Sequence, residues 1–354
     1  DNNYIDLNVT DLKFQGELKW KPIHKIELSA LGAYKTSMTT QSHTIKDYSN
    51  QAWAFRAMDD ATMRQANPWL YTDPENANTL PVSVLPVGGF YRETKYSMDS
   101  YDFRGTASYN DVYNENHIFN FFGGMEINAV NRQRTWFNGV GMQYEMGMLP
   151  AYEYQYFKQG SEENAQYYTV ERTRQREVSF FGTATYSYQG KYTLNGTLRY
   201  EGSNKLGKSR SARWLPTWNL SAAWNAHEEK FWQPLLDYVS NMTLKASYSL
   251  TADRGPASAS NSRAIIQSYN TWRPFTSIKE SGLRVVNIEN QELTYEKKHE
   301  LNIGAEIGFL NNRINLAVDW YKRDNYDLIG IINTKGTGGQ LTKLANVALS
   351  LIHI

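Results

Sequence analysis

The chain has 354 residues and a formal net charge of +1, so its composition predicts no surface for nucleic acid or another polyanion. It has no cysteine, which excludes disulfides, cysteine-ligated metals and thiol nucleophiles. The mean hydropathy is −0.61, and no apolar run is long enough for a transmembrane helix. A transmembrane β-barrel remains compatible with these values, since half of its strand residues face a polar lumen.

About ten segments alternate apolar and polar side chains with a period of two, the signature of half-buried β-strands. In chain order they are residues 11–21, 24–37, 101–110, 117–128, 179–189, 191–201, 217–225, 242–250, 299–310 and 313–324.

The hairpin of residues 179–201 shows the alternation most clearly. In its return arm Leu198 and Tyr200 point to one side, whereas Arg199 and Glu201 point to the other. Each arm is about ten residues long, the length of a tilted membrane-spanning strand. Gln189-Gly190 between the arms predicts a tight turn.

The connections between these segments alternate between short and long. The short ones lie around Pro22, Asp111, Gln189, Glu228 and Asn311. The Glu228 connection, residues 228–241, has a short helical pattern. Two long connections, residues 38–97 and 129–177, are expected to be irregular, and the first has a helix-like patch at 52–66. Transmembrane barrels have short periplasmic turns and longer extracellular loops, whereas a soluble β-sandwich has no reason to sort its loops in this way. The pattern predicts an all-β fold, a transmembrane antiparallel up-and-down β-barrel.

Three stretches resemble SusC/RagA-like TonB-dependent outer-membrane transporters. Residues 192–231 resemble the family's mid-barrel strands, its basic loop and its W-x-x-x-x-E-x-F turn. Residues 242–253 and 291–328 resemble later strands, the second with an F-x-N-N-R turn. The order and spacing of the stretches also match. The sequence departs from the family pattern at three places: Leu206 stands for a usual Phe, Ala252-Asp253 for Gly-Asn and Tyr295 for Trp. These differences concern which substrate is bound rather than membership of the family.

The resemblance implies a protein embedded in the lipid bilayer of the outer membrane of a Gram-negative bacterium. It implies import of oligosaccharides, or less often peptides, with energy relayed through TonB and a SusD-like surface lipoprotein as a lid. No enzymatic activity and no cofactor are expected. A siderophore or cobalamin receptor of the same barrel type, or a passive porin, is the alternative.

The resemblance also bears on domain organisation. Residues 1–348 are expected to be a partial barrel, about ten of roughly 22 strands. The signal peptide, the plug and the C-terminal strands of a full member are absent, so we expect a fragment. Residues 349–354, LSLIHI, match no strand of the family and resemble a translated sequencing adapter. We expect them to be a non-native tail and leave them out of the fold prediction.

Two classes of residue are candidates for function. Sugars stack on exposed aromatic rings, so loop aromatics are predicted to contact a ligand; the alternative is that they pack the loops together or contact the lipoprotein partner. These are Trp69, Tyr71, Trp136, Trp272 and Phe275. Charged side chains on the polar strand faces are predicted to face the lumen, and the alternative is a merely solvated barrel interior. These are Arg199, Glu201, Lys245 and Glu306. The six histidines lack the spacing of a metal site.

Overall fold

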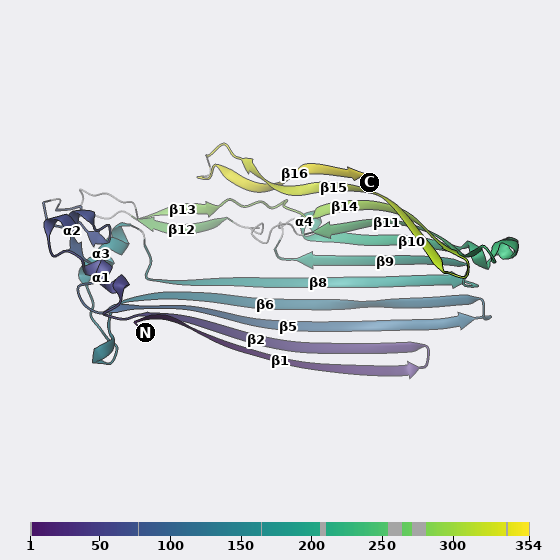
Figure 1. The fold of residues 1–354 in the computed structure, drawn as a ribbon, viewed down its shortest axis with the longest axis horizontal. Helices are drawn as coiled ribbons and strands as arrows, with labels where there is room; N and C mark the ends of the chain where they lie inside the picture. The colour runs from purple at the N-terminus through teal and green to yellow at the C-terminus, as the bar shows by residue number, and fades with distance from the viewer. Residues whose placement is uncertain are drawn as a thin grey trace.

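The fold is known from a computed structural model, which describes residues 2–76, 78–163, 165–205, 210–253, 264–270, 281–337 and 339–353. One large antiparallel sheet dominates it (Figure 1). Its long strands are β1 (Asn3–Ile23), β2 (Ile26–Ile45), β5 (Gly89–Tyr113), β6 (His117–Gln143), β8 (Tyr168–Tyr188), β9 (Tyr192–Ser203), β10 (Trp214–Asn225), β11 (Val239–Asp253), β14 (Glu296–Phe309), β15 (Ile314–Asn333) and β16 (Thr342–His353).

The remaining elements are short and lie in the connections. The strands among them are β3 (Leu70–Tyr71), β4 (Val82–Ser83), β7 (Leu149–Pro150), β12 (Ile265–Asn270) and β13 (Ser281–Asn287). The helices are α1 (Asn50–Arg56), α2 (Ala61–Ala66), α3 (Tyr154–Glu162) and α4 (Arg210–Arg213), with 3-10 turns η1 (Tyr144–Met146), η2 (Ala226–Glu228) and η3 (Lys230–Leu235). Within the described ranges, no helix is long and apolar enough to cross a membrane.

The sheet has the up-and-down order predicted from the sequence. Each long strand pairs with the next long strand along the chain, and β7 pairs with β6 at one end. The short connections all lie at the same end of the sheet, and the helices α1, α2 and α3 gather at the opposite end (Figure 1). The sequence-based prediction that short and long connections sort to opposite ends is therefore confirmed.

The hairpin of β8 and β9 has the predicted register. Leu198 pairs with Gly182 on one side and with Trp218 on the other, while Thr197 pairs with Thr183. Gln189 and Gly190 both take positive φ, 51° and 69°. The turn comprises residues 189–191, since Tyr188 pairs with Tyr192, and the amide of Lys191 donates to the carbonyl of Tyr188 at 2.9 Å. Apolar and polar side chains therefore separate onto opposite faces of the sheet.

Several strands extend well beyond the predicted segments. β2 continues to Ile45, β5 begins at Gly89, β6 continues to Gln143 and β8 begins at Tyr168. The expectation of long irregular loops over residues 38–97 and 129–177 was wrong in these parts. In the extensions both faces are largely polar, so the period-two signal disappears although the backbone ladder continues. The predicted helical patch at 52–66 is two helices, α1 and α2.

Residues 349–353 also differ from expectation. They were left out of the predicted strands, whereas the structure places them in β16, where Leu351 pairs with Asp324 and His353 with Lys322. They continue the ladder along β15 as ordinary strand backbone does. That these residues are a non-native tail stays a prediction.

Few apolar side chains are buried, and the larger of their two described clusters lies at the end where the helices gather. It consists of Ile45, Ala52, Leu85 and Phe90 and joins the ends of β2 and β5 to α1. Ser49 caps α1 by accepting a hydrogen bond from the amide of Ala52 at 3.1 Å. This core holds the connection between β2 and β5 against the sheet.

Candidate functional site

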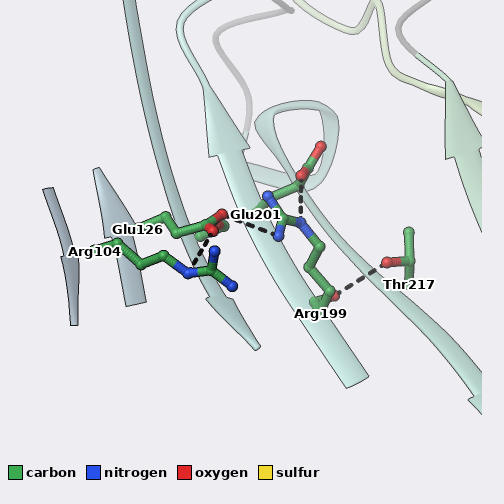
Figure 2. Close-up of polar contacts among 6 residues, drawn as sticks. Arg104, Glu126, Arg199, Glu201 and Thr217 are labelled. Carbon is green, nitrogen blue, oxygen red and sulfur yellow. Dashed lines mark hydrogen bonds and ion pairs between the residues drawn. The ribbon is translucent and has the colours of Figure 1, made fainter. Parts of the chain in front are cut away.

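The polar face of the sheet carries a network of charged side chains that spans four strands (Figure 2). Arg104 on β5 lies 3.3 Å from a carboxylate oxygen of Glu126 on β6. Arg199 on β9 donates to the other oxygen of Glu126 at 3.2 Å and to Glu201 at 2.9 Å. Ser179 on β8 also donates to Glu126, at 3.3 Å. Glu126 is therefore the centre of the network.

The network is held by register as well as by charge. Glu126, Ser179 and Glu201 are successive pairing partners across β6, β8 and β9, so their side chains lie in one row on one face. The guanidinium of Arg104 also lies over the ring of Phe181, 5.5 Å from its centroid. Ser179 is buried, but the two arginines and Glu126 remain partly exposed, so the network is accessible to water and to a solute at this face.

The other two charged residues singled out from the sequence, Lys245 and Glu306, lie further along the same face. Lys245 on β11 donates to Glu306 on the neighbouring strand β14. Both side chains alternate with apolar neighbours: Leu244 and Ile307 belong to the opposite face. The structure thus joins Arg199 with Glu201 and Lys245 with Glu306. The assignment of this face to a barrel lumen stays a prediction.

Sequence reasoning missed Glu126, although a signal was present. Glu126 lies between Met125 and Ile127, and extending the alternation through the predicted strand at 117–128 would have placed it on the polar face. Its contact with Arg199 could not have been found, because Arg199 is far away in sequence and one strand lies between β6 and β9.

The opposite face of the sheet is exposed and apolar. Phe14 and Leu18 on β1, Leu198 on β9 and Ile303 on β14 are all about half or more exposed. Contiguous apolar surface of this extent on a folded chain marks an interaction with a membrane or a partner.

The long connections at the other end are joined by a buried polar contact. The Tyr71 hydroxyl donates to a carboxylate oxygen of Glu162 on α3 at 2.6 Å, and both side chains are buried. Lys158 on α3 lies 2.5 Å from Asp73 and 3.8 Å from Glu162. These contacts link the connection after β2 to the connection after β6.

The electrostatics of this contact follow from burial and from the partners. Burial, and next the hydrogen bond to the Glu162 carboxylate, raise the pKa of Tyr71 far above its usual range. The hydrogen bond from Lys158 holds the pKa of Asp73 below its usual value. No sequence pattern pointed to Glu162 or Lys158, because their partners come from a distant connection.

The predicted ligand-contacting aromatics are not all equivalent. Trp69 is 51% exposed and stacks on Phe55 with ring centroids 4.8 Å apart, so one of its faces is covered. Trp136 is half-buried on β6, between Thr94 and Thr169 in the ladder. Tyr71 is only 5% exposed, so its expected stacking on a ligand disagrees with its position between the connections. Trp272 and Phe275 lie outside the described residues.

Metal ligation finds no support in the described part of the chain, where no three histidine or acidic side chains come together in a metal-binding group. The charged side chains instead pair with one another. The arrangement can orient a polar solute along one face of the sheet.

The sequence matches a known protein family over most of its length. The family model described as "TonB dependent receptor-like, beta-barrel" matches residues 15–350. "TonB-dependent receptor P39" of Formosa agariphila is 26% identical over 236 residues, which cover 65% of this chain and 21% of that protein. "TonB-dependent receptor SusC" of Bacteroides thetaiotaomicron is 29% identical over 166 residues, which cover 46% of this chain and 16% of that protein.

A solved structure described as "Structure of the RagAB peptide transporter" has a similar fold. The TM-score is 0.71 at 20% sequence identity, and the match covers 98% of this chain and 33% of that one. The likeness therefore concerns the fold. The chain spans about a fifth of the length of P39 and a third of the RagAB chain.

Proposed function

The chain belongs to the TonB-dependent receptor-like β-barrel family, and on this premise we propose that the complete protein imports oligosaccharides or peptides across an outer membrane. The observation that carries the proposal is the division of one continuous sheet into an exposed apolar face and a charged polar face. In a bilayer, the apolar face of a barrel contacts lipid and the polar face lines the lumen.

The polar face suits a path for a hydrophilic solute. Its arginines, such as Arg104 and Arg199, are paired with carboxylates rather than free, so the wall offers donors and acceptors without a large net charge. A neutral oligosaccharide or a peptide backbone can exchange hydrogen bonds with such a wall. A strongly charged lumen would instead select ions of one sign.

The ligand would be recognised first at the end where the helices gather. Trp69 and Trp136 are the described aromatics that we propose as contacts, because each retains exposed ring surface near the connections. Sugar rings and peptide side chains both pack on such rings. Glycans are favoured by the resemblance to SusC/RagA-like transporters, and peptides by the fold shared with RagAB, which is described as a peptide transporter.

The partners follow from the same premise. We propose that TonB supplies the energy and that a SusD-like surface lipoprotein closes over the barrel mouth. The joint name RagAB, for a structure that this fold resembles, supports a second component. The buried link between Tyr71 and Glu162 would hold two long connections together as one docking surface.

Ligand binding to the purified complete protein tests the proposal. A panel of oligosaccharides and of short peptides is titrated by calorimetry against the protein and against Trp69→Ala and Trp136→Ala. We expect one class to bind and each variant to weaken binding by about tenfold, the value of one good aromatic contact. Phe231→Ala, an exposed aromatic in η3 at the opposite end, is the control and should bind normally. Absence of binding by both classes would contradict the proposal.

A further inference from the structure

Three arginines follow one another on a single face of β8. They are Arg172, Arg174 and Arg176, and the residues between them belong to the polar face. Val178 and Phe180 lie on the same side of the strand as the three arginines. All three side chains are exposed. They therefore extend the apolar face of the sheet and lie on the side opposite the charge network around Glu126.

The position of the three arginines along β8 coincides with the end of an apolar band. From Tyr188 to Val178 every side chain on this face is aromatic, aliphatic or glycine, and the three arginines follow at once. About ten residues of a tilted strand cross the hydrocarbon core of a membrane. In a membrane, the arginines would therefore lie at the level of the lipid headgroups.

Their positive charges are not compensated by carboxylates in the described residues. Arg172 donates to the amide oxygen of Gln133 at 2.9 Å, and Arg176 donates to that of Asn131 at 2.7 Å and to two backbone carbonyls. The Arg174 guanidinium has no described side-chain partner. The arginines of the polar-face network differ, because each of them is bound to a glutamate.

Asp99 on β5 is a carboxylate on the same face, two strands away, and its described partner is the Tyr34 hydroxyl, which donates to it at 3.0 Å. A guanidinium has five N–H groups, and the contacts of Arg172 and Arg176 use one and three of them, so N–H groups remain available in a row. Guanidinium binds phosphate oxygens in bidentate fashion, and anionic membrane surfaces attract such clusters.

The apolar face below the arginines is hollowed. A shallow depression of about 840 Å³ is lined in part by small residues, among them Gly123, Gly182 and Ala184, with Phe121 and Leu198 beside them. Gly182 lies six positions from Arg176, a distance of about 20 Å along the strand. An acyl chain spans a comparable length, so one lipid could reach both features.

We propose that this face binds an anionic, phosphate-bearing lipid of the outer leaflet. The phosphate lies on Arg172, Arg174 and Arg176, and an acyl chain lies in the hollow around Gly182. The inference rests on the proposed membrane location of the apolar face. It adds a specific lipid site to the general apolar belt.

Lipid retention by the complete protein tests this site. The protein is reconstituted in phosphatidylcholine vesicles containing lipid A, or the same lipid A after removal of its phosphates, then extracted in neutral detergent and analysed for bound lipid. Wild type should retain the phosphorylated form preferentially. In the variant R172Q/R174Q/R176Q the preference should fall roughly 10- to 100-fold at low salt, because each surface cation contributes independently.

Two further variants separate the parts of the site. R132Q/R134Q removes two arginines from the opposite face of β6 and should keep the preference. Gly182→Leu fills the hollow, where the nearest atom to a new Cβ is 3.9 Å away, and should lower retention of both lipid forms. Equal retention of the two lipids by wild type, or an unchanged preference in the triple variant, would overturn the proposal.

Ligand uptake measured on the same variants keeps this inference distinct from the proposed function. If the triple variant loses the preference for phosphorylated lipid A and still takes up ligand, the result supports both the lipid site and the import proposal. If the wild-type protein shows the lipid preference but imports no ligand, the import proposal is contradicted and the lipid site is still supported.

Discussion

Glu126 and Arg199 lie on strands that are not neighbours, yet Arg199 Nη1 is 3.2 Å from Glu126 Oε2 across the intervening strand β8. The same carboxylate binds Arg104 through its other oxygen, so one glutamate joins strands β5 and β9. The carboxylate of Glu126 therefore connects side chains on two strands, β5 and β9, that do not pair with each other.

Neutralising Glu126 should destabilise the barrel more than neutralising a carboxylate with one arginine partner. We expect Glu126→Gln to lower the free energy of unfolding of the complete protein by about 1–2 kcal/mol, since two half-exposed ion pairs are lost. Denaturant unfolding in lipid vesicles measures this. Glu171→Gln, which loses only the exposed pair with Arg134, is the control and should cost less than about 1 kcal/mol. Equal costs would argue against a central role for Glu126.

Arginine substitutions at adjacent positions of β9 test which face meets lipid. Leu198→Arg should cost about 2–4 kcal/mol near the bilayer midplane, because the charge enters hydrocarbon. Thr197→Arg should cost much less, because Thr197 lies on the polar face, where its hydroxyl is 3.3 Å from that of Thr183. The free energies are compared by unfolding the complete protein from vesicles. Similar costs for the two variants would refute the assignment of the faces.

Removing the Tyr71 hydroxyl should loosen the long connections while leaving the sheet intact. Tyr71→Phe keeps the buried ring but removes the hydrogen bond to Glu162, which costs about 1–3 kcal/mol for a buried acceptor. We expect faster proteolysis within the connection that follows β2, with unchanged melting of the barrel. Tyr152→Phe, at an 80% exposed side chain, is the matched control. Unchanged proteolysis in Tyr71→Phe would show that this contact does not join the connections.

The contact between Asp73 and Lys158 should respond to acid. The folded-state pKa of Asp73 is lowered, so its stabilising effect is present above the unfolded value of about 3.9 and is lost as the pH falls through the folded value. Spin labels on Thr79→Cys and Glu163→Cys, in a cysteine-free background, report the separation of the two connections. We expect a narrow distance distribution from pH 8 to pH 5 that broadens below about pH 4.

The matched variant Asp73→Asn removes the titrating group. Its distance distribution should be broader at neutral pH and should change less on acidification. A variant that behaves like wild type at every pH would rule out Asp73 as the acid-sensitive group.

The strands within the apolar band could be predicted from the sequence, because one face is apolar there and the other is not. Leu198 beside Thr197 is enough to fix the two faces of β9. The extensions could not be predicted. Ser97 and Asp99, for example, lie on the face of β5 that carries Tyr101 and Phe103 further along, so the apolar face turns polar there and only backbone pairing with β2 and β6 continues the strand.

The candidate site was only partly accessible to sequence reasoning. Arg199 and Glu201 were identified because both alternate with apolar neighbours. Glu162 was missed because its partner Tyr71 belongs to another connection. Tyr71 was predicted to contact a ligand because its own segment does not show that contact with Glu162 buries it. The arginines on β8 were missed because residues 129–177 were expected to form a loop.

The central claim of an energised importer is tested most directly by uptake of a labelled oligosaccharide or peptide into cells. Cells with the intact gene are compared with a deletion strain, a complemented strain and a strain that lacks TonB. We expect saturable uptake that is lost in the deletion and TonB-less strains and restored by complementation. Equal uptake in the intact and deletion strains for both ligand classes, or uptake that persists without TonB, would contradict the claim.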